Sequence, residues 1–289
     1  MPEVILLVIL AYFLKKVRIF KEDDTKVLIN YIIYVTLPAV SFRSAHSLGI
    51  NRSVFLVVAL AWSGIIFCML VSFIVGKAIG LKDKDLRVFL LVSSFGNTAF
   101  LGYPYTLSFF GQEGLKYAVI YDSLGSFLLV STLGFFVSIG RFNIKELLTF
   151  PPFWGLVLGF LLKDYNLHPE VIKVLDTVAG SLSPVVLFTL GLSLSYSEIK
   201  KYLPISLLAL FIKMFLSVLI TYQMGQLFNA QGLAFKVSLL ESGMPSMMMA
   251  GVLSLRYGLN YELAFATVGL GLLLSFITLP IFMRLLVSF

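Results

Sequence analysis

Long apolar segments separated by short polar connections constrain the fold of this chain of 289 residues more than any other feature. A helix needs about 20 mainly apolar residues to cross a bilayer. Ten segments are predicted as spans: 2–17, 27–46, 53–79, 87–110, 115–139, 151–163, 171–194, 203–228, 233–256 and 261–286. The segments 2–17 and 151–163 are short, and on length alone either could be re-entrant. Because lipid cannot satisfy exposed backbone groups, the pattern predicts an all-α integral membrane protein.

The composition excludes several other classes of protein. Hydrophobic residues make up 59% of the chain and charged residues only 13%, whereas soluble domains carry roughly 25% charged residues. A cytosolic enzyme and a nucleic-acid-binding domain are therefore not expected. One cysteine and two histidines are too few for a disulfide framework or a Cys/His metal centre.

The distribution of Lys and Arg predicts the topology. Fourteen basic residues lie at the connections that follow residues 17, 79, 139, 194 and 256. Seven lie on the other side, and Lys213, inside 203–228, completes the 22. This bias places the first set in the cytoplasm and both termini outside, in a multi-pass protein of the cell (inner) membrane. No positive stretch precedes the first apolar segment, so it is predicted to be a span and not a cleaved signal.

The two halves of the chain resemble each other at an offset of about 146 residues. The matched pairs are Asn30 and Pro38 with Asp176 and Pro184, Gly96 and Gly111 with Gly243 and Gly258, and Tyr117 and Gly125 with Tyr261 and Gly269. Five helices per half is an odd number, so the second half must be inverted in the membrane. We therefore predict a first five-helix repeat at 1–139, a cytoplasmic linker at 140–150 and a second, inverted repeat at 151–289. Inverted repeats are typical of secondary transporters.

Two corresponding spans carry helix breakers at mid-segment. The segment 87–110 contains Gly, Pro and polar residues between 93 and 104, and 233–256 contains them between 241 and 246. Proline removes a backbone donor and clashes with the preceding turn. An unwound backbone at membrane depth survives only where it is buried in protein or lines a cavity, and its free N–H and C=O groups attract ions. We predict that both helices are broken and cross near the bilayer midplane; the alternative is two ordinary kinked helices.

Ionisable residues inside apolar spans mark functional sites by default. Asp122 and Ser126 share one helix face, and with Ser94, Asn97 and Glu241 they offer oxygen ligands for a small alkali cation. A carboxylate that exchanges protons needs the same positions. Ser94, Asp122, Ser126 and Glu241 are thus predicted to couple transport to Na+ or H+, and the choice between the two ions stays open. Lys213 and Asp176 are each predicted to form an ion pair or to contact an anion, and an interfacial carboxylate is an equal alternative for Asp176.

Several motifs together resemble the auxin efflux carrier family, which includes the plant PIN proteins and many prokaryotic members. The motifs are Gly96-Asn97-Thr98 with Gly102-Tyr103-Pro104 and Gly111, Leu37-Pro38-Ala39-Val40-Ser41-Phe42, Met244-Pro245, Arg256-Tyr257 and Leu279-Pro280. The resemblance covers nearly the whole chain. It implies ten helices in two inverted repeats, a fold shared with the bile acid sodium symporter superfamily, in which a comparable cluster binds sodium.

The resemblance also implies that the spans form two domains with different roles. A panel is formed by 2–17, 27–46, 151–163 and 171–194, and a crossover core by the other six segments. The motion implied is an elevator-like or rocking displacement of one set against the other. The substrate-binding residues implied are Thr36, Pro38, Ser41, Gly96, Asn97, Thr98, Pro104, Pro245 and Ser246.

The predicted function is secondary transport of a small organic anion, such as a carboxylate, by alternating access. Plant members have Asn after the crossover proline, where this chain has Ser246. The long cytoplasmic loop of many plant members is also absent. Both differences favour an organic acid over auxin as the substrate. The alternatives are an intramembrane enzyme that uses buried Asp or Glu, a channel, and a sodium-coupled importer of bile-acid-like anions. No catalytic motif accompanies the enzyme alternative. We expect no cofactor beyond Na+ or H+, no metal beyond an alkali cation and no nucleic-acid partner. The expected partners are the substrate anion and the surrounding lipid bilayer, and a homodimer is compatible with the sequence.

Overall fold

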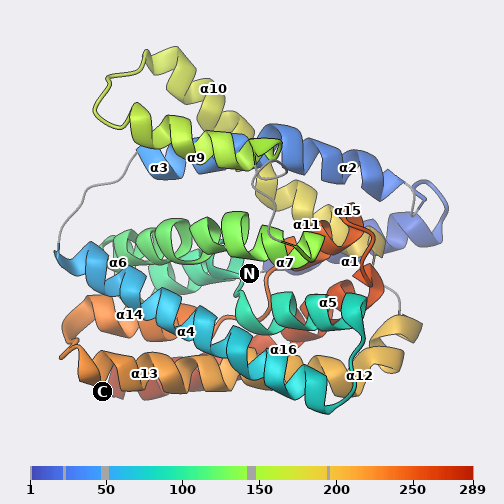
Figure 1. Ribbon diagram of the computed structural model, residues 1–289. Coiled ribbons are helices and arrows are strands. Elements are labelled where there is room, and N and C mark those ends of the chain that lie inside the picture. The colour runs from blue at the N-terminus through green and yellow to red at the C-terminus, as the bar shows by residue number, and fades with distance from the viewer. Residues whose placement is uncertain (1, 22–23, 47–51, 142–147, 194–195, 289) are drawn as a thin grey trace. The chain divides into compact units, whose positions relative to one another are not determined.

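A computed structural model describes residues 2–21, 24–46, 52–141, 148–193 and 196–288 (Figure 1). These residues form helices, and the described part of the chain contains no strand beyond one isolated bridge. Six helical stretches within it are long and apolar enough to cross a membrane: 25–43, 53–78, 98–139, 169–193, 197–227 and 261–284. The all-α membrane architecture is therefore confirmed, whereas the ten predicted spans are not. The predicted 140–150 linker lies mostly outside the described residues.

Five helices begin within one residue of their predicted positions. They are α1 (Pro2–Lys16), α4 (Arg52–Ala78), α9 (Pro151–Leu161), α14 (Gly232–Ser242) and α16 (Tyr261–Ser288). Their long apolar runs explain the agreement, because burial or lipid contact of an apolar side chain does not depend on details of tertiary packing.

Two predicted starts were wrong because the helices extend beyond their apolar parts. α5 (Asp83–Ser94) begins before residue 87, with acidic residues in its first turn. Such residues interact favourably with the positive end of the helix dipole, and Asp83 pairs with Arg87 one turn later. α12 (Tyr196–Phe211) likewise begins before residue 203 and carries the Glu198–Lys201 pair in its polar first turns. Hydropathy detects the apolar part of a helix and not its polar continuation.

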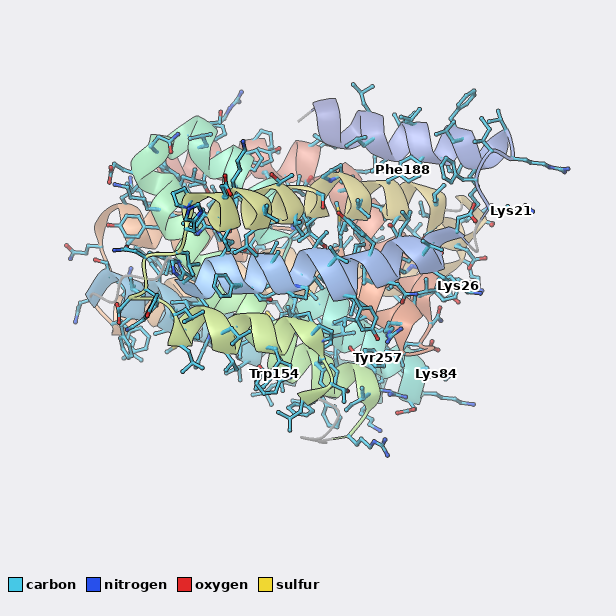
Figure 2. All side chains as sticks on the ribbon, turned by 90° about the horizontal axis from the view of Figure 1, so that it is seen from above. Lys21, Lys26, Lys84, Trp154, Phe188 and Tyr257 are labelled. Carbon is cyan, nitrogen blue, oxygen red and sulfur yellow. The ribbon has the colours of Figure 1, made fainter. Side chains whose placement is uncertain are left out.

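The chain divides into two compact units, which are described separately. Unit 1 comprises residues 1–49 and 131–194. It contains α1, α2 (Thr25–Tyr31), η2 (Ile32–Thr36), α3 (Leu37–His46), α7 (Phe135–Ile139), α9, α10 (Pro169–Gly180) and α11 (Leu182–Ser193), where η denotes a π-helical turn. Figure 2 shows Lys21 and Lys26 at the same end of this unit, where α1 leads into α2.

Glycines allow the helices of unit 1 to pack closely. A Cβ atom at Gly155 would lie 2.3 Å from the Pro38 carbonyl oxygen, and one at Gly159 would lie 2.5 Å from that of Phe42. These two glycines, four residues apart, form the small-residue face by which α9 packs on α3. Gly191 brings α11 equally close to α1, since its Cβ would lie 2.4 Å from the Val8 carbonyl oxygen.

Unit 2 comprises residues 50–130 and 195–289. It contains α4, α5, η3 (Thr98–Gly102), α6 (Tyr103–Ile120), η4 (Tyr121–Phe127), α12, η6 (Ile212–Leu216), α13 (Ser217–Leu227), α14 (Gly232–Ser242), α15 (Met249–Arg256) and α16. η5 (Val130–Gly134) begins at the boundary. α4, α13 and α14 pack side by side, as Figure 1 shows in blue and orange. Gly111, at φ 64° and ψ −165°, redirects the chain between the predicted segments 87–110 and 115–139, a conformation that glycine adopts without a steric cost.

Candidate functional site

Two helix interruptions meet inside unit 2. α5 ends at Ser94, and helical structure resumes at Thr98; α14 ends at Ser242, and α15 begins at Met249. The Asn97 N–H donates to the Pro245 carbonyl oxygen at 2.7 Å, and the Met247 N–H donates to the Phe95 carbonyl oxygen at 3.0 Å. Gly96 and Ser246 form an antiparallel bridge between these contacts. Both predicted interruptions are therefore present, and their backbones satisfy each other.

The sequence explains why both helices stop here. Pro245 has no N–H to continue a helix. The Ser246 hydroxyl donates to the Val92 carbonyl oxygen, a group that would accept from the Gly96 N–H in a continuous helix. Gly271 of α16 allows close approach, because its Cβ would lie 3.0 Å from Cβ of Pro245. The break is thus a packed and hydrogen-bonded element of the unit.

Asp122 lies in η4 and accepts hydrogen bonds with both carboxylate oxygens. The Thr98 hydroxyl donates to Oδ1 at 2.5 Å, and the Tyr103 hydroxyl donates to Oδ2 at 2.8 Å. Both donors belong to the chain that resumes after the first break. The carboxylate therefore connects η4 to the start of the second half-helix.

Glu241 lies in the last turn of α14 and is fully buried. Its Oε1 accepts a hydrogen bond from the Thr106 hydroxyl at 3.0 Å, and its Oε2 has no partner among the described residues. Gly102 faces this carboxylate so closely that a Cβ there would lie 2.0 Å from Oε2. An unpartnered carboxylate oxygen in such a place is costly and is available to a ligand or a proton.

Lys213 lies in η6 and is 2% exposed. Its Nζ donates to the Ser242 carbonyl oxygen at 2.6 Å. No carboxylate of the described chain lies within salt-bridge distance of Nζ.

The other predicted residues of unit 2 differ in their environments. Asn97 is 4% exposed and directly precedes η3. Ser94 and Ser126 are buried, and the Ser94 hydroxyl also lacks a partner within the described chain. Pro104 is exposed in the first turn of α6. No group of three His, Cys, Asp or Glu side chains among the residues described could hold a metal ion.

The predicted residues of unit 1 have local partners. The buried Thr36 and Ser41 hydroxyls donate to the Ile32 and Leu37 carbonyl oxygens, four residues earlier in the same helices. Pro38 packs against Gly155 of α9. Asp176 forms an ion pair with Arg43, with 2.5 Å between Oδ1 and Nε, and its side chain is 53% exposed.

Three residues of the polar cluster were missed by the sequence analysis as site residues: Gly102, Tyr103 and Thr106. A signal for two of them exists in the sequence, because Thr98, Gly102 and Thr106 recur at every fourth position and so share one helix face. Tyr103 was noted only as part of a motif. Nothing in the linear sequence indicates that its hydroxyl reaches a carboxylate in a different segment.

The comparisons with known proteins agree with this architecture. The model of a family described as "Membrane transport protein" matches residues 1–138 and 134–283. An uncharacterized transporter of Methanocaldococcus jannaschii is 33% identical over 276 residues, which cover 90% of this chain and 89% of the relative. An uncharacterized transporter of Methanothermobacter thermautotrophicus is 28% identical over 287 residues, covering 96% and 94%. The chain therefore belongs to the membrane transport protein family, that of the auxin efflux carriers, and is a multi-pass membrane transporter.

Proposed function

We propose that this transporter is a secondary carrier that moves a small organic anion, such as a carboxylate, by alternating access. The observation that carries the proposal is the pair of hydrogen-bonded helix interruptions with a buried polar cluster beside them. The Asn97 side chain is buried directly before the half-helix that starts at Thr98. Its amide N–H groups and the first N–H groups of the half-helix that starts at Thr98 are donors suited to a carboxylate.

The proposed mechanism uses unit 2 as the moving element and unit 1 as the scaffold. Unit 1 contains the segments predicted as the panel, and unit 2 contains most of the predicted core, with the end of 115–139 assigned to unit 1. Within unit 1 the contacts are paired as inverted repeats require, since α3 packs on α9 and α11 packs on α1. These features support an elevator-like displacement between two inverted five-helix repeats.

The proposed coupling group is the pair of carboxylates Asp122 and Glu241. Asp122 has both oxygens occupied by hydroxyl donors, whereas Glu241 keeps Oε2 without a partner among the described residues. Glu241 is thus the better candidate to exchange an ion during transport. Ionisable residues buried in membrane proteins line ion and proton pathways.

Counterflow in liposomes tests the proposal. Purified protein is reconstituted with internal malonate, succinate or malate, and uptake of the same labelled dicarboxylate is followed. A carrier accumulates label transiently through exchange. We expect Asn97→Ala to lower the initial rate at least about tenfold, the equivalent of about 1.4 kcal/mol, with an unchanged unfolding temperature. The exposed Asn166 of unit 1 provides the matched control Asn166→Ala, which should behave as the wild type.

Two results would contradict the proposal. Label that merely equilibrates, whether or not internal substrate is present, identifies a channel. Wild-type exchange by Asn97→Ala means that the polar cluster does not bind the anion.

A further inference from the structure

We infer that Lys213 is a built-in cation: its ammonium group occupies the position where a free cation would otherwise bind at the helix interruptions, so that the carrier works without sodium at this position. The inference rests on the proposed transport function and specifies its ion requirement. It concerns Nζ of Lys213, the Ser242 carbonyl oxygen and the backbone at Gly96.

The ammonium group lies at the negative end of a half-helix. Ser242 is the last residue of α14, and its carbonyl oxygen accepts a hydrogen bond from Nζ at 2.6 Å. The final carbonyl groups of a helix have no partner within the helix and carry partial negative charge. In transporters with discontinuous helices, such carbonyl groups coordinate cations. Here a side chain of the protein takes that place.

The same ammonium group also lies against the other interruption. A Cβ atom at Gly96 would lie 2.9 Å from Cε and 3.1 Å from Nζ of Lys213. A side chain at position 96 would therefore require the end of the lysine side chain to shift. Because Gly96 pairs with Ser246 across the break, the ammonium group lies next to both interrupted helices.

The burial of Lys213 argues against a purely lipid-facing or snorkelling role. Its side chain is 2% exposed and lies in the π-helical turn η6, a feature frequent at functional sites. A buried charge is costly unless partners compensate for it. The Ser242 carbonyl oxygen supplies one such partner.

An occupied cation position has a direct chemical consequence. Sodium would need the same carbonyl oxygen that Nζ already uses, and two positive charges there would repel each other. Sodium is therefore excluded at this position as long as Lys213 is present. Removing the lysine side chain should create a cavity that accepts a monovalent cation of suitable size.

The test compares wild type, Lys213→Ala and Lys236→Ala. Lys236 is a half-buried lysine of α14 and provides the matched control. Thermal unfolding of the purified proteins is measured while NaCl replaces choline chloride at constant ionic strength, and separately with n-propylammonium, which has the size of the part removed. We expect no saturable response in the wild type or in Lys236→Ala. Lys213→Ala should gain at least about 2 °C at saturating sodium or n-propylammonium.

Each outcome decides the matter. A sodium response of the wild type as large as that of Lys213→Ala overturns the inference, and so does a Lys213→Ala protein that folds but responds to neither cation. If Lys213→Ala can be purified only with n-propylammonium or sodium present, the inference is supported. If neither cation restores folding of Lys213→Ala while Lys213→Met folds normally, the ammonium charge is not required and the inference fails. Because unfolding is measured without substrate, these results are independent of the dicarboxylate exchange that tests the proposed function.

Discussion

Units 1 and 2 differ in the charged residues that their described parts bury. In unit 1 the Thr36 and Ser41 hydroxyls return to their own helices, and the Arg43–Asp176 ion pair stays partly exposed. In unit 2 Lys213 and Glu241 are buried, and two helices are interrupted between them. Buried charges lower stability unless partners compensate for them. Their concentration in one unit supports the proposal that the transport site lies in unit 2, whereas unit 1 is distinguished by close helix packing at glycines.

The largest effect is expected from neutralising Glu241. Glu241→Gln keeps the shape of the side chain and the acceptor for Thr106 but removes the charge. We expect counterflow to fall roughly a hundredfold or more, on the scale of about 3 kcal/mol for a charged hydrogen-bonded group, with little change in unfolding temperature. The control is Glu113→Gln, because Glu113 is exposed in unit 2 and pairs only locally with Lys116. Equal rates for the two variants would place transport outside the polar cluster.

A packing change should damage unit 1 in a different way. Gly155→Ala places a methyl group 2.3 Å from the Pro38 carbonyl oxygen, which belongs to the backbone and cannot rotate away. We expect a loss of about 1–3 kcal/mol in stability, measured as a lower unfolding temperature, with the transport rate per folded molecule retained. Gly180→Ala is the control, since no atom lies within 4 Å of its added Cβ. An unchanged unfolding temperature for Gly155→Ala would show that α9 and α3 do not pack as closely as described.

The smallest effect is expected from the ion pair of unit 1. A partly exposed pair contributes about 0.2–1 kcal/mol and is weakened by salt. A double-mutant cycle of Arg43→Gln and Asp176→Asn, measured by thermal unfolding at low and high salt, should give a coupling energy in this range that decreases with salt. A transport defect in Asp176→Asn with normal stability would instead favour the anion-contact alternative and remove the contrast between the units.

The sequence by itself determined the features that depend on local chemistry. Apolar runs identified α1, α4, α9 and α16, because any apolar helix of that length must be buried in protein or lipid. Breakers at Gly96 and Pro245 identified both interruptions, because glycine and proline act on the backbone at their own positions. The intramembrane residues Asp122, Lys213 and Glu241 were also identifiable, since a charge in an apolar run is conspicuous wherever the chain folds.

Only the tertiary structure decided which groups meet. The sequence predicted that the two interrupted helices cross but not which residues meet, and the backbone pairs Gly96 with Ser246. Lys213 was expected to face a carboxylate or an anion, and its hydrogen bond goes to the Ser242 carbonyl oxygen. The partners of Asp122 and Glu241, and the ion pair of Asp176 with Arg43, join segments that are distant in sequence. Helix periodicity fixes which residues share a face, but the depth and rotation at which two helices pack are set by close contacts such as those of Gly102 and Gly155, and these exist only once the helices are assembled.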